Sequence, residues 1–545
     1  MVRTRTLWLA AAIACGAAAA RPARGAGADG PPRAAGTAPV SPASAPATTT
    51  VRAVYIPESV KAEIREQIKQ EVIAEFYREN WALPNTVPEW TRRIHFYGDV
   101  RIRYELDVFP AGNANTGDFP DFYAINVSKP FDVRGVDLSG DKYLDVDTNR
   151  SRFRLRARLG VEADAGSGFT IGIKIASGDQ NSPISPNQTL GGSGGFFSRY
   201  QIWIDQAYIR YYPIHDAGGD LMLVVGRFEN PFFTARDLLW SENVNLDGFG
   251  FLGAFAAGAG WRPFVVLGAS PVYSTAFAYP VEQTVKYNSV NKWLFGAQLG
   301  TDFRPSDRVL LKLGAALYYF YKVSGVVSPP TCDTYLTNVT CTTDDTRPSF
   351  AQKGNTYIAL RTPSPAALAQ EAAYPLTTPR YEYFGLASQF QEVFATGKFD
   401  YRFAPATLVS LEGEFAWNAG YSKTKIFDAQ PVNNCAFDSS GKCQSYLGGN
   451  YAYVARLTFG TPTEVKQWDW NASLAYLYIQ SDALIDAFTN PDFGFGGTNL
   501  KGYWAGGRVA LANNLTLGVR WMSADNIMGP TYRFDLLQVD FWGRF

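Results

Sequence analysis

Apart from a short apolar stretch at its N-terminus, the chain lacks long apolar runs that could form a membrane-spanning helix. Beyond the first 20 residues, no run of about 18 or more apolar residues occurs. A location within a membrane would therefore require a closed barrel of strands, because only helices and barrels satisfy their own backbone polar groups in lipid. An excess of one charge is also lacking, since Lys plus Arg and Asp plus Glu each number 50. This balance gives no electrostatic reason to expect a nucleic-acid partner.

Histidine is scarce as well, which argues against most enzyme chemistry. The chain has two histidines: His95 opens the first predicted strand, and His215 precedes Asp216 in a predicted turn. We find no phosphate-binding glycine loop, no H-E-x-x-H metal motif and no nucleophile elbow. The sequence therefore predicts no enzyme activity, no cofactor and no metal site.

Residues 1–28 have the composition of a signal peptide. Arg3 and Arg5 precede the apolar stretch LWLAAAIACGAAAA, and small residues as far as Ala28 offer cleavage sites. We therefore expect the chain to be exported from the cytoplasm.

Cysteine is also infrequent, and its spacing agrees with export. After Cys15 has left with the leader, the remaining cysteines are Cys332 and Cys341, and Cys435 and Cys443. Each pair lies within a stretch rich in small polar residues, a setting that favours a local disulfide in an oxidising compartment rather than a metal site.

Two segments separate the leader from the predicted strands. Residues 29–56 are rich in Ala and Pro and are predicted to form a disordered linker, because they cannot bury enough apolar surface to fold. Residues 57–90 are predicted to contain a periplasmic amphipathic helix, over 57–80, followed by a linker. The helix could pack on its own domain, plug the barrel, self-associate, or bind the cell wall or another periplasmic partner. Its apolar stripe consists of Val60, Ile64, Ile68, Val72 and Phe76.

What the chain does have, from about residue 91 onward, is side-chain alternation with period two. In HFYGDVRIRYEL, residues 95–106, apolar residues occupy one face of an extended chain and mostly charged residues occupy the other. SRFRLRARLGVEAD, residues 151–164, places four arginines on a single face. Because an unpaired buried charge is costly, that face must meet water or paired acids.

About sixteen such runs occur, and the links between them alternate between short and long. Short turns such as RPSD at 304–307 alternate with links as long as 323–389. Outer-membrane barrels show this pattern of short periplasmic turns and long outer loops, whereas soluble sandwiches have no reason to show it. The sequence therefore predicts an all-β membrane protein, with an antiparallel transmembrane barrel over residues 91–545.

The final strand has the form of an assembly signal for such a barrel. Its alternating apolar residues end on the C-terminal phenylalanine, the pattern that the barrel-assembly machinery recognises. The residues of this predicted signal are Leu537, Val539, Phe541 and Phe545.

Several stretches resemble those of the putative porin family of Gram-negative outer-membrane proteins. They are IDQAYIRYYP at 204–213, VVGRFENPFF at 224–233, LLWSENVNLDGFG at 238–250, GGTNLKGY at 496–503 and the ending LLQVDFWGRF. The resemblance implies a sixteen-stranded porin in contact with outer-membrane lipid, passing small hydrophilic solutes or ions by diffusion, and assembling as a homotrimer. A substrate-specific channel and a structural outer-membrane anchor that uses the N-terminal helix remain the alternatives.

Strand parity sorts the charged residues by face, and one face should line the pore. The third long link, 230–249, is expected to fold inward and narrow the lumen; alternatively, it packs at the mouth or at a subunit interface, and the arginines merely pair with neighbouring acids. Asp205 breaks the alternation, so either a bulge lies there or Asp205 sits above the membrane band. The predicted pore-lining residues are Arg101, Arg103, Arg152, Arg154, Arg156, Arg158, Lys174, Arg210, Arg227, Glu412 and Glu414, and the constriction candidates are Arg236, Asp237, Glu242 and Asp247.

Overall fold

The computed structural model describes residues 89–545, apart from residues 115, 129, 134–141, 193, 237–238, 276–289, 330–342, 376–377 and 379. The predicted leader, linker and helix therefore lie outside the described residues, as do Cys332 and Cys341. A short helix, α2 (Glu89–Arg92), leads into the first strand. No helix among the described residues has both the length and the hydropathy needed to span a membrane.

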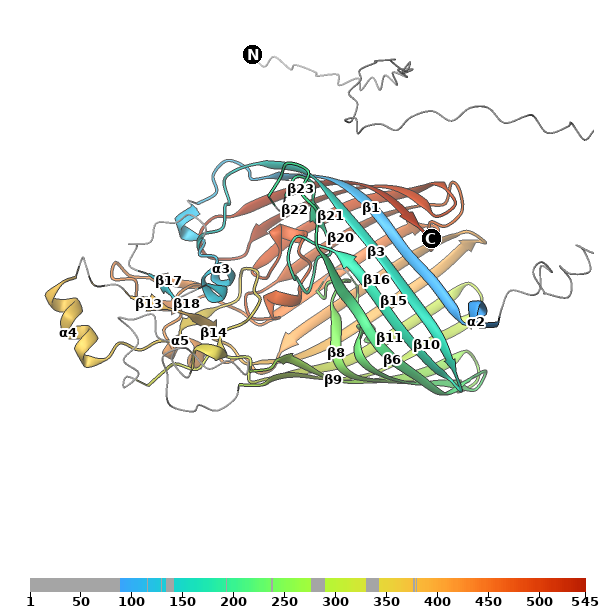
Figure 1. Cartoon of the computed structure of the whole chain (residues 1–545), viewed down its shortest axis with the longest axis horizontal. Helices are drawn as coiled ribbons and strands as arrows, with labels where there is room; N and C mark the ends of the chain where they lie inside the picture. Colours follow the sequence, from blue (N-terminus) through green and yellow to red (C-terminus); the bar gives the residue numbers. More distant parts are fainter. Residues whose placement is uncertain are drawn as a thin grey trace, which may run out of the picture. The chain divides into compact units, whose positions relative to one another are not determined.

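Sixteen antiparallel strands form a closed barrel (Figure 1). Each pairs with the next along the chain, and the first strand closes the cylinder by pairing with the last, Asp99 opposite Arg544 and Val108 opposite Asp535. The predicted fold class and strand number are thus confirmed. The strands are β1 (Ile94–Val108), β3 (Arg150–Gly166), β4 (Phe169–Ser177), β6 (Ile202–Asp216), β7 (Gly219–Glu229), β8 (Asn245–Phe255), β9 (Trp261–Tyr273), β10 (Lys292–Ser306), β11 (Val309–Tyr321), β15 (Phe390–Ala404), β16 (Thr407–Asn418), β19 (Tyr451–Gly460), β20 (Trp470–Ile479), β21 (Leu500–Ala512), β22 (Leu515–Asn526) and β23 (Arg533–Arg544).

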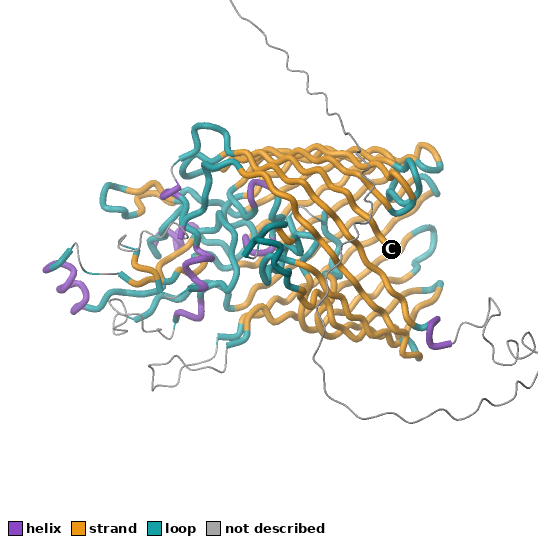
Figure 2. The backbone as a smooth tube through the Cα atoms, turned by 45° about the horizontal axis from the view of Figure 1, so that its top comes forward, coloured by secondary structure: helices purple, strands orange, loops and turns teal. Residues whose placement is uncertain are grey.

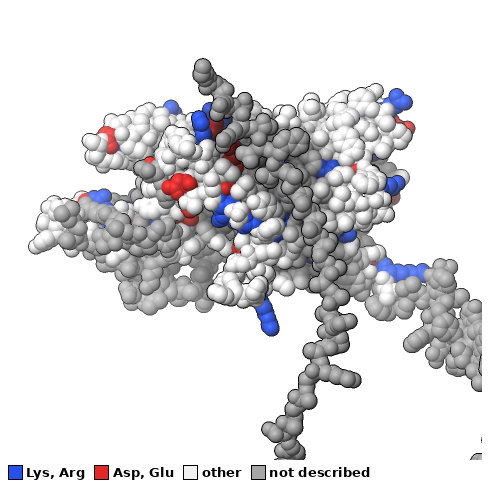
Figure 3. Space-filling model, turned by 90° about the horizontal axis from the view of Figure 1, so that it is seen from above, with Lys and Arg blue, Asp and Glu red and all other residues white. Residues whose placement is uncertain are grey.

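Apolar side chains cover the outside of the barrel. On β1, Phe96 is 68% exposed whereas Arg103 is 2% exposed, because alternate residues point out of and into the cylinder. Most of the described surface in Figure 3 is uncharged. An outer band of this kind is the surface that lipid requires.

The two ends of the barrel differ (Figure 2). One, the short-turn end, carries tight turns such as that between Ser306 and Val309, together with the start of β1 and the end of β23. The other, the long-loop end, carries the long links. We number these L1 (109–149), L2 (178–201), L3 (230–244), L4 (274–291), L5 (322–389), L6 (419–450) and L7 (480–499).

The long loops carry short elements of their own. In L5, for example, the Ser364 hydroxyl accepts a hydrogen bond from the Ala367 N–H and so begins α4, with Pro365 as its first residue. L1 contains η1 (Thr116–Asp118), α3 (Phe122–Val127) and β2 (Phe131–Asp132); L2 contains β5 (Gln188–Thr189); L5 contains η3 (Asp344–Thr346), β12 (Tyr357–Ala359), α4 (Pro365–Ala373), β13 (Tyr381–Glu382) and β14 (Phe384–Leu386). L6 contains α5 (Lys423–Asp428), β17 (Cys435–Phe437) and β18 (Cys443–Tyr446), and L7 contains η4 (Asp486–Phe488) and η5 (Phe493–Phe495).

A disulfide joins the two strands of the L6 hairpin. It links Cys435 to Cys443, as the spacing of these cysteines predicted. Ile426 of α5 and Tyr446 pack against it, so the bond lies within a small apolar cluster of its own.

The irregularity at Asp205 is a β-bulge. The pairing of β4 with β6 shifts between Lys174 opposite Gln206 and Ile175 opposite Ile204, which leaves Asp205 as the extra residue. Asp205 reaches the inside of the barrel, where its carboxylate lies 2.9 Å from the Lys174 ammonium. The bulge therefore resolves the parity conflict without placing a charge in lipid.

The long-loop half of the barrel has an apolar core. Inward residues of the strands, such as Tyr318 and Phe320, pack against residues of L3 and L7. Trp240 of L3 stacks on Phe488 of L7 with ring centroids 5.7 Å apart, and Phe488 stacks on Phe320 at 5.9 Å. Loop side chains thus fill much of the space that an empty cylinder of this size would leave to water.

Candidate pore and its constriction

L3 crosses the interior of the barrel. It leaves β7, and its Phe233 forms two hydrogen bonds of 2.7 Å with the Gln298 side chain of β10, one from its N–H and one to its C=O. Its Ala235 N–H donates to the Glu414 carboxylate of β16 at 2.8 Å. Farther along, the Glu242 carboxylate lies 3.7 Å from the Arg156 guanidinium of β3. L3 therefore contacts widely separated parts of the barrel wall.

L7 also folds inward, and strand side chains hold its backbone. The Ile485 N–H donates to the Glu392 carboxylate of β15 at 3.1 Å, and the Asn418 amide of β16 donates to the Asp482 C=O at 2.8 Å. The Ser241 N–H of L3 donates to the Phe488 C=O at 2.9 Å. L3 and L7 thus form one interior assembly, which we call the L3–L7 plug.

Charged groups fasten the far end of L7. The Asp492 carboxylate lies 2.8 Å from the Arg103 guanidinium of β1 and 3.1 Å from that of Arg520 on β22. Burial disfavours a charged carboxylate, but the two arginines outweigh it and hold the pKa of Asp492 well below its usual range. In the first half of L7, burial instead raises the pKa of Asp486 to about 7, although a hydrogen bond from the Tyr357 hydroxyl acts in the opposite direction.

The arginines predicted to line the pore face inward on β1 and β3, where acids accompany them. We call this group the arginine wall. Arg103 and Arg156 have side chains only 2% exposed, and neighbouring side chains cover them; those of Arg154 and Arg158 are 11% and 22% exposed. The pairs are Arg101 with Asp540, Arg103 with Asp540 and Asp492, Arg152 and Arg154 with Glu105, and Arg156 and Arg158 with Asp99.

The other predicted pore residues are paired as well. Lys174 meets Asp205, Arg210 meets Glu162 at 3.2 Å, and Glu412 pairs with Arg456. Glu414 is 3% exposed and holds L3 as described above.

The constriction candidates fall in different places. Arg236 lies in L3 and pairs with Glu229 of β7. Asp247 is not part of L3, because β8 begins at Asn245; its carboxylate lies 2.9 Å from the Arg227 guanidinium. Asp237 lies outside the described residues. Glu242 is thus the L3 acid that the structure brings to the arginine wall.

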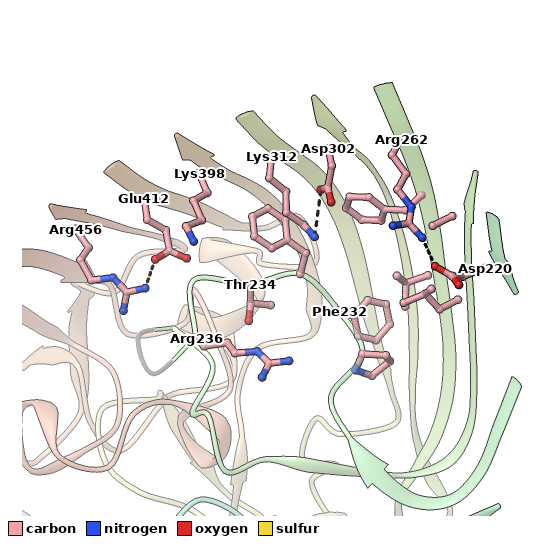
Figure 4. Close-up of a pocket in the computed structure, with 16 residues that line it drawn as sticks. Asp220, Phe232, Thr234, Arg236, Arg262, Asp302, Lys312, Lys398, Glu412 and Arg456 are labelled. Carbon is pink, nitrogen blue, oxygen red and sulfur yellow. Dashed lines mark hydrogen bonds and ion pairs between the residues drawn. The ribbon is translucent and has the colours of Figure 1, made fainter. Parts of the chain in front are cut away.

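A cavity of about 560 Å³ lies between L3 and the inner wall of β7–β19, toward the short-turn end (Figure 4). Most of its charged side chains were not among the residues that strand parity predicted to line the pore, although some of them follow the same alternation, as Lys312 does between Leu311 and Leu313. These side chains point from the strands toward L3. The charged residues that line it are Asp220, Arg236, Arg262, Asp302, Lys312, Lys398, Glu412 and Arg456.

No group of three or more His, Cys, Asp or Glu side chains with the spacing of a metal site occurs in the part of the chain that the structure describes. The cavity and the L3–L7 plug contain ion pairs, amide hydrogen bonds and apolar contacts. Such groups can orient and select a solute.

Comparison with known proteins places the chain in a family. A family described as putative porins matches residues 9–545. No protein of curated function matches the chain. Among solved structures, the outer membrane channel DcaP of Acinetobacter baumannii is 11% identical, with 83% of this chain and 97% of that chain covered and a TM-score of 0.37. OprB of Pseudomonas putida is 11% identical, with 85% and 96% covered and a TM-score of 0.41. OmpF of Salmonella typhi, in complex with daunomycin, is 8% identical, with 83% and 97% covered and a TM-score of 0.36.

The family match extends over nearly the whole chain and agrees with the closed barrel, its apolar outer band and its charged interior. The chain belongs to the putative porin family, and it is a channel protein of the bacterial outer membrane.

Proposed function

We propose that this porin is a narrow, selective channel in which the L3–L7 plug restricts the lumen and inward charges choose among small polar solutes. The observation that carries this proposal is the course of L3, which is held by Gln298 and Glu414 on one side and reaches Arg156 on the other. A loop held at several points of the wall narrows the water-filled section of a sixteen-stranded barrel, and pore width and lining charge then set selectivity.

The apolar core favours a channel of restricted specificity over a wide general pore. Trp240, Phe488 and Phe320 occupy lumen space that a general porin would leave to solvent. Solutes would therefore pass beside the plug, along charged parts of the wall. A binding step along this route would make transport saturable, whereas a wide pore would conduct in proportion to solute concentration.

We propose further that the chain is exported from the cytoplasm and assembles as a homotrimer in the outer membrane. A signal peptide over residues 1–28 would export it, and the barrel-assembly machinery would recognise its C-terminal strand. Phe541 of β23 is 45% exposed and Phe545, which directly follows β23, is 66% exposed, so both are accessible for such recognition. The segment 57–90 would bind the cell wall or a periplasmic partner, or act on the barrel itself.

The direct test is single-channel recording in a planar lipid bilayer, with the reversal potential measured under a KCl gradient. Open currents in multiples of three support a trimeric channel. A barrel that inserts and stays closed contradicts the proposal and favours the structural anchor. Removing residues 29–90 separates these outcomes, because a channel keeps its conductance and an anchor loses its attachment to the envelope.

Charge selectivity is tested by Arg154→Glu, which changes the sign of the charge at this position. The Arg154 side chain pairs with Glu105 but remains 11% exposed to the lumen. We expect the reversal potential to shift toward cation selectivity. Lys466→Glu is the matched control, since it makes the same change at an exposed side chain in the turn between β19 and β20. Equal shifts for the two variants would contradict a lining role for Arg154.

A further inference from the structure

We propose that the cavity beneath L3 binds small oxyanions, carboxylates or phosphates, between Lys312 and Lys398. This inference rests on the channel function proposed above and names the class of solute that the channel favours. Lys312 of β11 and Lys398 of β15 are direct cross-strand partners, and both point into the cavity (Figure 4). Their side chains are 29% and 35% exposed, so solutes in the lumen reach them.

The two lysines belong to a continuous row of opposed residues on six adjacent strands. Asp302 is opposite both Arg262 and Lys312, and Lys398 is opposite both Lys312 and Glu412. Arg456 is opposite Glu412 and completes the row. Four cations and two carboxylates make up the row itself, and two acids beside it compensate one of its ends and its middle, since Asp220 pairs with Arg262 and Asp400 with Lys398.

Like charges directly opposite each other destabilise a sheet unless an ion of opposite sign lies between them. Elsewhere in this barrel the chain supplies that ion: Arg103 and Arg154 are also cross-strand partners, and Glu105 lies 3.9 Å from one guanidinium and 3.4 Å from the other. The shared Glu105 carboxylate thus compensates the opposed guanidinium groups of Arg103 and Arg154.

The lysine pair has no such shared acid among the described residues. Lys312 meets Asp302 at 3.2 Å, and Lys398 meets Asp400 at 3.3 Å. Asp302 belongs to the strand on the far side of Lys312, and Asp400 lies two residues along β15 from Lys398. Each acid therefore pairs with one lysine, and the position corresponding to that of Glu105 between the two arginines is left to an anion from solution.

L3 supplies the opposite side of the cavity. Thr234 and Arg236 face the row from L3, which adds a guanidinium to the lining, although Glu229 also pairs with it (Figure 4). Beside the lysines, the rings of Phe233 and Phe264 have their centroids 4.8 Å and 4.9 Å from the Lys312 ammonium nitrogen. The cavity thus offers cations for an oxyanion and aromatic surface for the carbon skeleton of an organic acid.

The test uses the full-length porin in a planar bilayer, with inorganic phosphate added at constant KCl concentration to the side that faces the short turns. Phosphate is expected to block the current in a saturable manner. Lys312→Gln/Lys398→Gln removes both ammonium groups with little change in side-chain length. We expect it to raise the half-blocking phosphate concentration about tenfold or more, because charge-assisted hydrogen bonds to the anion are lost.

One further variant makes the result specific. Lys466→Gln removes a lysine charge from an exposed turn at the short-turn end, outside the cavity, and should retain the phosphate block. The same experiment with an organic dicarboxylate distinguishes carboxylates from phosphates as the ligand. If the dicarboxylate blocks the current at a lower concentration than phosphate does, the aromatic surface favours carboxylic acids.

The outcomes distinguish this inference from the proposed function. Channels that conduct in KCl but show no saturable phosphate block overturn the oxyanion site alone. Equal loss of block in the lysine double variant and in Lys466→Gln overturns it as well, because the effect would then be one of overall charge and not of the cavity. Absence of any conductance in wild-type protein instead refutes the channel on which the inference rests.

Discussion

Gln298→Ala should loosen L3 and make the channel open more often to a wider state. The Gln298 side chain is 1% exposed, and it holds both the N–H and the C=O of Phe233 at 2.7 Å. Alanine removes both hydrogen bonds and leaves two backbone groups unpaired in the interior. At about 1 kcal/mol for each lost bond, the docked state of L3 loses roughly 2 kcal/mol, a factor of about 30 in its equilibrium with the released state.

Single-channel recording measures this effect as the frequency of large-conductance openings. We expect these openings to become about 30 times more frequent in Gln298→Ala, since the remaining L3 contacts, such as Ala235 with Glu414, still return the loop to its docked position. Gln467→Ala is the control, because Gln467 is exposed in a turn at the short-turn end and donates one hydrogen bond to the Leu511 C=O. Unchanged opening statistics in correctly folded Gln298→Ala would refute the assignment of L3 as the restricting loop.

Three further predictions concern L7, L6 and the last strand. Burial raises the pKa of Asp486 from 3.8 to about 7, so the docking of L7 is strongest below pH 3.8 and weakens progressively up to about pH 7. Openings should become more frequent across that range, and Asp486→Asn should abolish the dependence on pH. Replacing Cys435 and Cys443 by Ser opens a loop of sequence separation 8, which should cost the L6 hairpin about 2.5 kcal/mol and speed its cleavage by protease while the heat-unfolding temperature of the barrel stays the same. Phe545→Ala should lower the yield of heat-modifiable folded barrel in the outer membrane, and an unchanged yield would contradict its role in assembly.

The barrel wall could be predicted from the sequence because the alternation of inward and outward side chains depends only on neighbouring residues in the chain. Period two sorts neighbouring residues into two faces, so Arg154 and Phe153 were assigned to opposite sides without knowledge of their partners. The disulfide of L6 was predictable for the same reason, since its two cysteines lie close together in the chain. At Asp205 the broken alternation indicated either a bulge or a place above the membrane band, and the strand register was needed to show that it is a bulge.

The arrangement inside the barrel could not be predicted, because its contacts join distant segments. Arg103 and Asp492 are separated by 389 residues, and no local pattern indicates that L7 returns to β1. Parity likewise placed Glu412 and Glu414 on one face but did not reveal that one faces a cavity and the other holds the backbone of L3. The row through Lys312 and Lys398 depends on the exact register between strands, which period two leaves undetermined.

The apolar core within the barrel has a consequence for the order in which this protein matures. L3 and L7 have their partners on strands from both halves of the chain, and the bond between Arg103 and Asp540 spans 437 residues. These contacts gain a fixed geometry only when β23 has closed on β1. The long loops must therefore reach the outer side of the membrane as unfolded chain and fold back into a cylinder that already exists, a slow step with high loop-closure entropy. A newly inserted barrel would then conduct as a wide pore for a time and narrow as its own loops fold into it.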